Sequence, residues 1–321
     1  KHGDELFKLA KEKGVQIGFE ASVAGGTPVI KAIREGLVAH KILWFAGILN
    51  GTSNYIISYM SNSEVSFEEA LESAQSLGLA ESDPTLDING TDAAQKASIL
   101  ASLAFQVPFN FSSVLYEGIE NVTLKDIRYA EELGYSIKHI ALGKVKDNKV
   151  SVCAHPMLVK NSSILSKVGQ EMNALEVFAE GIGSTVYYGP GAGPIPTASA
   201  VIADLVDIGK GALFNVPESS PNNTLIKQSQ DICARYIRIE VLNEPGVIAK
   251  ISSIFAKNDI SIDSLIQHDS SLQTISDKGI VSVVIITGSL NNILSAEVSS
   301  SLEEMDEVHG DVKNFRIHSE Q

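Results

Sequence analysis

The chain has 321 residues, of which 44% are hydrophobic and 20% charged, a balance that is typical of folded globular domains and excludes a disordered or fibrous chain. Its formal net charge of −14 argues against nucleic acid as a partner, because such binding depends on Lys and Arg side chains that neutralise phosphates. Only 2 cysteines are present, and no apolar stretch approaches the roughly 20 residues that span a bilayer, so we expect a cytoplasmic protein without a disulfide framework or a membrane partner.

The first residues, KHGDELFKLA, have the spacing of an amphipathic helix with Leu6, Phe7 and Leu9 on its apolar face. The chain starts with Lys1 rather than Met, and its start carries no signal-peptide pattern. We therefore expect a chain that lacks its front part.

A stretch rich in Ser, Asn and Pro predicts a linker at residues 216–231, between a domain of residues 1–215 and a domain of residues 232–321. In the first domain, short β-branched or aromatic runs predict strands at residues 15–21, 42–49, 136–145, 150–159, 175–182 and 184–189. Apolar residues at three-to-four spacing predict helices at residues 27–36, 50–61, 67–77 and 92–105. Ser66 and Glu69 form a capping box for the third helix. We expect an α+β fold in which a mostly antiparallel sheet has helices on one face.

The second domain has strands and helices in the order βαββαβ, which is that of a ferredoxin-like fold. The expected elements are strand 236–242, helix 246–258, strands 260–268 and 280–288, helix 291–305 and strand 312–318. The first loop, from Asn243 to Gly246, turns directly into a helix, and the turn at Asn258 leads back into a strand. Both features resemble the ACT domain, a small ligand-sensing module. A ferredoxin-like domain without a ligand is the alternative.

The densest polar cluster runs from Glu81 to Asp92 and ends in a helix that carries Lys96. Asp92 and Lys96 are four residues apart, so they share a helix face. Carboxylates arranged in this way can bind an ammonium group, and a lysine beside them can pass a proton to a carbonyl oxygen that becomes an alcohol. An ordinary helical ion pair after an Asp-rich turn is the alternative.

The segment GILNGTSNY runs from an apolar strand into a helix through Gly51 and Thr52. Helix starts bind carboxylates and phosphates because their first N–H groups are unpaired and the helix dipole is positive there. This segment therefore predicts an anion site, and simple capping of the helix is the alternative.

The segment FEASVAGGTP places Gly25 and Gly26 after an acid, Glu20, that the pattern predicts to be buried. A loop with unusual backbone angles can turn several carbonyl oxygens toward a hard cation, to which Glu20 would add charge. A plain connection between a strand and a helix would use the same glycines.

The segment YGPGAGPIPTASAVIADLV is a glycine-rich loop that opens a helix. Gly189, Gly191 and Gly193 permit close approach of a phosphate or a ring, although prolines interrupt the dinucleotide-binding fingerprint.

Together and in this order, these four segments resemble homoserine dehydrogenase over nearly all of residues 1–215. This family reduces L-aspartate 4-semialdehyde to L-homoserine with NAD(P)H in the biosynthesis of threonine, methionine and isoleucine, and its members often carry a C-terminal ACT domain that senses threonine. The resemblance implies an amino-acid substrate, threonine as an effector, and a homodimer or homotetramer.

By this resemblance, Lys96 is expected to donate the proton to the substrate carbonyl. The residues expected to hold the substrate are Glu81, Asp87, Asp92, Gly51 and Thr52. Those expected to bind a monovalent cation, usually sodium, are Glu20, Val23, Gly25 and Thr27. Those expected on the nicotinamide side of the cofactor are Gly189, Gly191 and Gly193. Those expected to bind threonine, where two ACT domains pair, are Asn243, Gly246, Val247, Asn258 and Ile260.

The sequence departs from the family in its first part. In the family, a domain with a G-x-G-x-x-G motif and a second active-site lysine precede this segment, and Lys1 does not match that lysine. Residues 1–18 and about 189–212 are the expected remnant of that domain. Leu79 replaces a common aromatic residue, which affects one substrate contact. We therefore expect this chain to be inactive by itself, and the alternative function is an amino-acid-binding, dimerising module without dehydrogenase activity.

Overall fold

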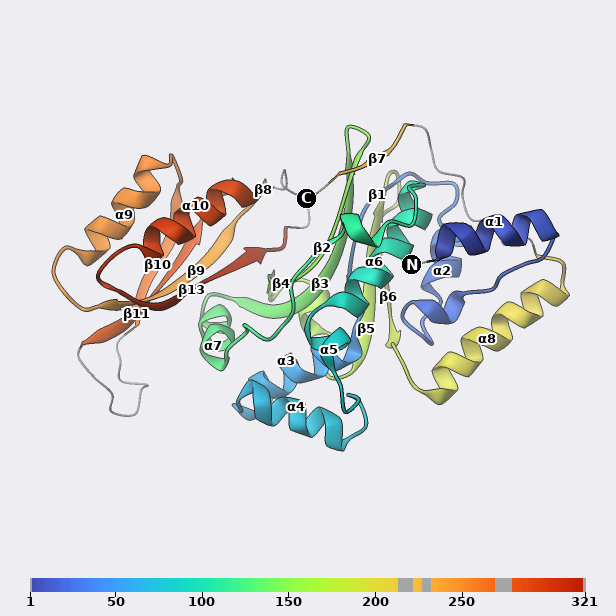
Figure 1. Ribbon diagram of the computed structural model, residues 1–321, viewed down its shortest axis with the longest axis horizontal. Coiled ribbons are helices and arrows are strands. Elements are labelled where there is room, and N and C mark those ends of the chain that lie inside the picture. Colours follow the sequence, from blue (N-terminus) through green and yellow to red (C-terminus); the bar gives the residue numbers. More distant parts are fainter. Residues whose placement is uncertain (1, 213–221, 227–231, 269–278, 320–321) are drawn as a thin grey trace. The chain divides into compact units, whose positions relative to one another are not determined.

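The computed structural model describes residues 2–212, 222–226, 232–268 and 279–319 (Figure 1). It divides into two units. The large unit comprises Lys1–Ile127, Ile137–Pro156 and Asn161–Gln228, and the small unit comprises Arg128–Ser136, Met157–Lys160 and Ser229–Gln321. Two short stretches from the middle of the chain therefore belong to the small unit. Among the described helices, none combines the length and the apolar character that a membrane crossing requires.

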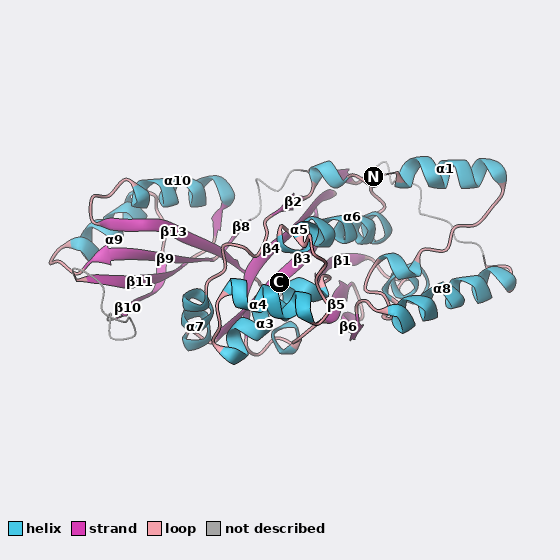
Figure 2. Cartoon of the chain, turned by 60° about the horizontal axis from the view of Figure 1, so that its bottom comes forward, coloured by secondary structure: helices cyan, strands magenta, loops and turns pink. Residues whose placement is uncertain are grey.

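The large unit is built on a sheet with the strand order β4-β3-β1-β5-β6 (Figure 2). These strands are β1 (Ile42–Ile48), β3 (Tyr135–Lys146), β4 (Lys149–Lys160), β5 (Met172–Ala179) and β6 (Gly183–Pro190). β1 runs antiparallel to β3 and β5, and β5 runs antiparallel to β6. The short strands β2 (Leu115–Tyr116) and β7 (Thr224–Leu225) add to β4 in parallel. The sheet is mostly antiparallel, which confirms the predicted α+β class.

The helices of this part of the chain are α1 (Gly3–Lys13), α2 (Val29–Lys31), α3 (Gly51–Ser63), α4 (Phe67–Ser76), α5 (Thr85–Ile88), α6 (Thr91–Phe105), α7 (Leu124–Glu132) and α8 (Pro194–Gly209). Of these, α3 and α6 contact strands of the sheet, and α7 begins in the large unit and ends in the small unit. Buried alanines on α6, among them Ala94 and Ala97, let this helix lie close to the sheet, and Phe105 at its end stacks on Phe45 of β1 with ring centroids 5.7 Å apart. The capping box of Ser66 and Glu69 is present at the start of α4.

The predicted strand at residues 15–21 is wrong. Residues 15–19 have no regular structure, and a 3-10 turn follows at Glu20–Ser22. The backbone N–H of Glu20 donates to the carboxylate of Asp204 on α8 at 2.9 Å, and a Cβ on Gly18 would lie 2.6 Å from the Cβ of Asp204. The segment is held by a helix side chain rather than by a neighbouring strand, so its β-branched pattern does not lead to pairing.

The small unit has the predicted βαββαβ order. Its elements are β9 (Arg235–Leu242), α9 (Val247–Lys257), β10 (Ile262–His268), β11 (Ile280–Thr287), α10 (Asn292–Glu303) and β13 (Val308–Ile317), with β8 (Ile232–Cys233) and β12 (Leu290–Asn291) as a separate pair. The strand order is β10-β11-β9-β13. Alternate residues of β9, including Ile237 and Ile239, form a core with Ile251 and Phe255 of α9.

The linker predicted at residues 216–231 falls mainly on residues 216–221 and 227–231, which lie outside the described residues. Between them, Thr224–Leu225 forms β7 and pairs with β4. Part of the predicted linker therefore belongs to the large unit's sheet.

Candidate active site

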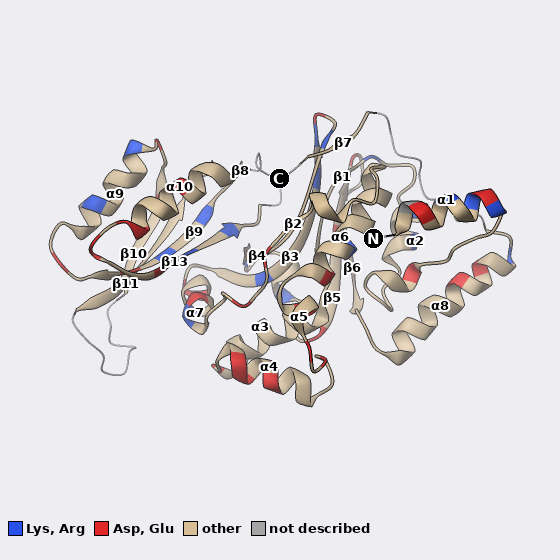
Figure 3. Ribbon diagram, viewed as in Figure 1, with Lys and Arg blue, Asp and Glu red and all other residues tan. Residues whose placement is uncertain are grey.

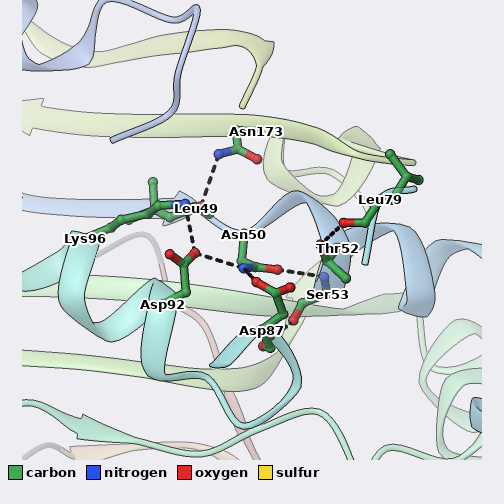
Figure 4. A network of polar contacts seen from close by, with 9 residues as sticks. All are labelled: Leu49, Asn50, Thr52, Ser53, Leu79, Asp87, Asp92, Lys96 and Asn173. Carbon is green, nitrogen blue, oxygen red and sulfur yellow. Dashed lines mark hydrogen bonds and ion pairs between the residues drawn. The ribbon is translucent and has the colours of Figure 1, made fainter. Parts of the chain in front are cut away.

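The candidate site begins where β1 ends and α3 starts. Asn50 caps α3, because its Oδ1 accepts a hydrogen bond from the N–H of Ser53 at 2.8 Å. Its Nδ2 donates to Oδ1 of Asp87 at 2.7 Å and to Oδ2 of Asp92 at 2.8 Å. One side chain therefore caps a helix and joins two carboxylates from two other helices, as Figure 4 shows.

Lys96 lies one turn after Asp92 on α6. Its Nζ is 2.8 Å from Oδ2 of Asp92 and donates to the carbonyl oxygen of Leu49 at 2.9 Å. An ammonium group has three N–H donors, so these contacts leave one for a ligand. The side chains of Lys96 and Asp92 are 20% and 29% exposed, which leaves the pair within reach of a small molecule.

A glycine turn between α5 and α6 brings Asp87 toward Asp92. Gly90 has a φ of +84°, in the left-handed region that favours glycine. A Cβ at this position would also lie 2.7 Å from the carbonyl oxygen of Glu117. Both the backbone angle and the packing therefore require glycine here.

Negative charge dominates this cluster. Burial raises the pKa of Asp87, the hydrogen bond from Asn50 opposes that rise, and the charge of Asp92 adds to it. Acidic residues also lie along α4 and on the segment that leads to α5 (Figure 3). Such a cluster attracts an ammonium group, and Lys96 is positioned within it.

Glu81 stands apart from this network. Its residue is exposed, and its backbone carbonyl accepts a hydrogen bond from Nε2 of Gln75 at 3.2 Å. None of the contacts found for Lys96 or Asp92 in the described residues involves the Glu81 side chain. The structure therefore brings together Asp87, Asp92 and Lys96 but not Glu81.

The first turn of α3 is the predicted anion site. The hydroxyl of Thr52 donates to the carbonyl of Leu79 at 2.7 Å, and a Cβ on Gly51 would lie 2.6 Å from the carbonyl oxygen of Glu171. The N–H of Ser53 donates to the side chain of Asn50. The N–H groups of Gly51 and Thr52, by contrast, donate to no other backbone group in the described part of the chain. These two N–H groups remain available to an anion.

Sequence reasoning assigned no role to Asn50 or Asn173, which both contact this cluster. Asn50 could have been found, because it is the first residue of a predicted helix and Asn is a preferred cap. Asn173 lies on β5, and its Nδ2 donates to the carbonyl of Leu49 at 3.1 Å. It carries no local signal, since its partner is far away in the sequence.

Glu20, in the predicted cation loop, is buried and caps α2. Its two carboxylate oxygens accept hydrogen bonds from the N–H groups of Ile30 at 2.9 Å and Lys31 at 2.8 Å. Burial raises the pKa of Glu20, and these two hydrogen bonds lower it. The side chain therefore has a structural role whether or not a cation binds nearby.

The backbone of the cation loop also makes a tight bend, which changes the directions of its carbonyl groups. Ala24 and Gly25 have φ values of +56° and +44°. The carbonyls of Ala24 and Thr27 accept hydrogen bonds within the loop, whereas those of Val23 and Gly25 accept none from the described backbone. The described residues contain no group of three or more His, Cys, Asp or Glu side chains placed to hold a metal, so a cation here would depend on such carbonyls.

Two of the three loop glycines are required by the chain's own packing. A Cβ on Gly189 would lie 2.6 Å from Oγ1 of Thr27, and one on Gly191 would lie 2.1 Å from the side chain of Asn173. Gly193 has a φ of +110°, and a Cβ there would meet its nearest atom at 3.6 Å. At Gly193 the backbone angle favours glycine, whereas packing does not require it.

The residues predicted to bind threonine lie in the small unit, on both sides of α9. Asn243 precedes the helix and accepts a hydrogen bond from Nε2 of Gln267 at 3.1 Å, while Gly246 caps its start with a φ of +93°. Asn258 follows the helix and donates to the carbonyl of Ile254 at 2.9 Å. The helix has 11 residues, or about 16 Å, so one chain does not bring the two groups together.

Comparison with known proteins gives matches in both units. Residues 28–206 match the model of the homoserine dehydrogenase family, and residues 235–296 match the model of the ACT domain. A homoserine dehydrogenase of Pseudomonas aeruginosa is 40% identical over 326 residues, which cover 98% of this chain and 74% of the relative.

Solved structures give the same result. A homoserine dehydrogenase from Thiobacillus denitrificans is similar with a TM-score of 0.92 and 39% identity, over 100% of this chain and 74% of that one. A hyperthermophilic archaeal homoserine dehydrogenase, whose structure is a complex with NADPH, is similar with a TM-score of 0.58 and 28% identity, over 68% of this chain and 62% of that one.

Proposed function

We propose, from the premise that this chain belongs to the homoserine dehydrogenase family of oxidoreductases and carries an ACT domain, that it serves the NAD(P)-dependent reduction of L-aspartate 4-semialdehyde to L-homoserine. The observation that carries this proposal is the position of Lys96, which contacts Asp92 and the Leu49 carbonyl and keeps one N–H for a ligand. The product would enter the biosynthesis of threonine, methionine and isoleucine.

The reduction adds a hydride from the nicotinamide to the aldehyde carbon and a proton to the aldehyde oxygen. Lys96 would give the proton, because its free N–H can meet the oxygen on which negative charge develops. Asp92 would hold the ammonium of Lys96 in place and, with Asp87, attract the substrate's ammonium group. Glu81 would join them when a substrate is bound, because its exposed side chain can change its conformation at little cost.

The substrate carboxylate would bind at the first turn of α3. The N–H groups of Gly51 and Thr52 are the donors that fit it, and the helix dipole adds favourable charge. The resulting pocket would have a negative end at Asp87 and Asp92 and a positive end at the helix start, which matches the charges of an amino acid.

A monovalent cation, with sodium as the first candidate, would bind at the loop of Glu20. The carbonyl oxygens of Val23 and Gly25, which accept no backbone hydrogen bond, support this assignment as cation ligands. Thr27 would provide a further ligand, and Glu20 would supply negative charge. Because this loop packs against the glycine-rich loop of Gly189–Gly193, the cation would stiffen the cofactor side of the site.

The nicotinamide side of the cofactor would lie beside Gly193, where the packing of the chain does not itself require glycine. The helix that follows, α8, has exposed apolar side chains at Ile195, Ile202 and Leu205, which are 82%, 58% and 62% exposed. Such a row of apolar side chains is typical of a face that packs against another domain, and a nucleotide-binding domain fits it here.

Replacement of Lys96 tests the proposal. In the complete enzyme, Lys96→Ala should lower kcat by about a hundredfold or more, because proton transfer is needed mainly in the transition state, while KM for the semialdehyde changes little. NADPH oxidation with the semialdehyde measures both constants.

The control for this test is Lys149→Ala, which removes an exposed lysine of the large unit at the start of β4. It should keep the original kcat. An unchanged kcat for Lys96→Ala would remove Lys96 from the mechanism.

A further inference from the structure

Asn173 and Lys96 donate to the same oxygen. Nδ2 of Asn173 is 3.1 Å from the carbonyl oxygen of Leu49, and Nζ of Lys96 is 2.9 Å from that oxygen (Figure 4). A carbonyl oxygen has two lone pairs, so both donors can be accepted at once. The strand β5, which carries Asn173, is therefore linked through one atom to the ammonium of the proposed proton donor.

The glycine-rich loop packs directly on Asn173. Asn173 is 1% exposed. A Cβ on Gly191 would lie 2.1 to 2.3 Å from Cγ, Nδ2 and Oδ1 of the Asn173 side chain. The loop leaves the amide little room to turn. The direction of its N–H donor is therefore fixed by the packing of a segment that sequence reasoning placed beside the cofactor.

Stability does not account for an asparagine at this position. Oδ1 of Asn173 is buried and has no hydrogen-bond partner among the described residues. A buried polar group without a partner is destabilising, so an apolar residue of similar size would be the more stable choice. We therefore look for the function of this side chain in Nδ2, which donates to the carbonyl of Leu49.

We propose that Asn173 is a positioning residue, which directs the ammonium of Lys96 through the shared carbonyl of Leu49. By occupying one lone pair of that carbonyl, Nδ2 leaves the other for Lys96. With Asp92 as the second partner, the ammonium then has its remaining N–H in a defined direction. This inference rests on the proposed role of Lys96 as proton donor.

Two variants separate the donor from the packing. Asn173→Leu keeps the volume and loses the donor. Asn173→Asp has an O–H that can donate to Leu49 when the acid is protonated, and when ionised it places a negative charge beside Lys96, which already faces Asp92 and Asp87. Asn54→Leu is the matched control, because Asn54 is also 1% exposed and donates to backbone carbonyls away from Lys96.

The first readout is steady-state kinetics of the complete enzyme. Asn173→Leu should lower kcat about tenfold to a hundredfold with KM within about threefold, as expected when a reacting group is misplaced by a fraction of an ångström to 1 Å. Asn173→Asp should retain activity at low pH and lose it as pH rises and the acid ionises. A kcat of Asn173→Leu equal to that of the unmodified enzyme would overturn the proposal.

The second readout does not depend on activity. The rate at which an amine-selective reagent labels Lys96, followed by peptide mass spectrometry across pH, should change in both Asn173 variants and stay unchanged in Asn54→Leu. Labelling of Lys149 serves as the internal reference.

The two readouts also separate this inference from the proposed function. Unchanged labelling together with a lowered kcat would mean that Asn173 acts on structure alone, and the inference would be wrong. Changed labelling, in an enzyme whose kcat survives Lys96→Ala, would uphold the link between the two residues and remove Lys96 from catalysis.

Discussion

The ammonium of Lys138 is buried in the large unit, with 6% of the residue exposed. It donates to the carbonyl of Val168 at 2.6 Å and lies 3.5 Å from Oδ1 of Asn54. Asn54 in turn donates to the carbonyls of Gln170 and Met172. Burial lowers the pKa of Lys138 from 10.5 to about 8, because the charged form loses solvation. This lysine therefore holds a loop beside the start of α3 at a cost in stability.

The pH dependence of stability reports that cost. Below pH 8 the lysine is charged in both the folded and unfolded states, and above pH 10.5 it is neutral in both. Between these values the unfolded chain binds more protons, so stability rises with pH. Relative to Lys138→Met, the free energy of unfolding should rise by about 2 to 3 kcal/mol from pH 7 to pH 10.

Urea unfolding of the chain and of the Lys138→Met variant at several pH values measures this difference. Groups common to both proteins cancel in the comparison. A difference that stays constant across the range would show that the ammonium is solvated as in water.

At the scale of single residues, the sequence predicts contacts within one helix better than contacts across the fold. Asp92 and Lys96 are four apart on a helix, and the ion pair between them follows from that spacing. Asp87 reaches them because Gly90 adopts a left-handed turn, which a glycine at that position allows but does not require. Asn173 could not be predicted, because it meets Leu49 across 124 residues of sequence.

At the scale of elements, the turn of Glu20 shows why one strand prediction failed. The run of residues 15–21 has strand composition, but Glu20 points its carboxylate at the start of α2 and its N–H at Asp204 of α8. Both contacts come from segments later in the chain, so no local pattern reveals them. The larger strands and helices, by contrast, follow from periodicity and from caps such as Ser66.

Glu20→Gln tests whether the turn holds a cation as well as a helix. The amide keeps the size but has one acceptor oxygen, so an N–H of Ile30 or Lys31 loses its partner, at a cost of about 1–3 kcal/mol. If Glu20 also supplies charge to a sodium ion, the sodium concentration that gives half-maximal activity should rise. Titration of the enzyme with NaCl at constant ionic strength measures that concentration.

Asp207→Asn is the control, because it removes a carboxylate that contacts Lys31 from α8 without touching the turn. It should leave the sodium dependence as it was. A destabilised Glu20→Gln variant with the original sodium dependence would mean that Glu20 is a helix cap only.

The sequence analysis missed two helices of the large unit's chain segments, α5 and α7. The helix α5 has four residues, too few for a periodic pattern, yet it carries Asp87. The helix α7 has nine residues and an amphipathic sequence that could have been recognised. Its last residues and the following ones, Arg128–Ser136, belong to the small unit. Membership of a unit depends on packing, and the sequence gives no sign of it.

At the scale of the whole molecule, the ACT domain indicates amino-acid binding, and we propose that threonine binds between two copies of the chain. Asn243 and Asn258 lie before and after α9, a helix about 16 Å long, and a single threonine is far shorter. One chain cannot bring both groups to the same ligand, whereas two chains related by a two-fold axis can place the start of one helix beside the end of the other. Threonine binding should therefore require a dimer.

Calorimetric titration with threonine, combined with sedimentation at several protein concentrations, tests this expectation. Threonine should bind saturably, shift the chain toward dimer or tetramer, and bind more weakly on dilution, because binding and association are linked. Serine, which lacks the methyl group, is the control ligand, and Asn243→Ala should weaken threonine binding without loss of the fold. Threonine that binds a monomer with full affinity would place the site within one chain, and absence of heat at any concentration would leave the ACT domain without this effector.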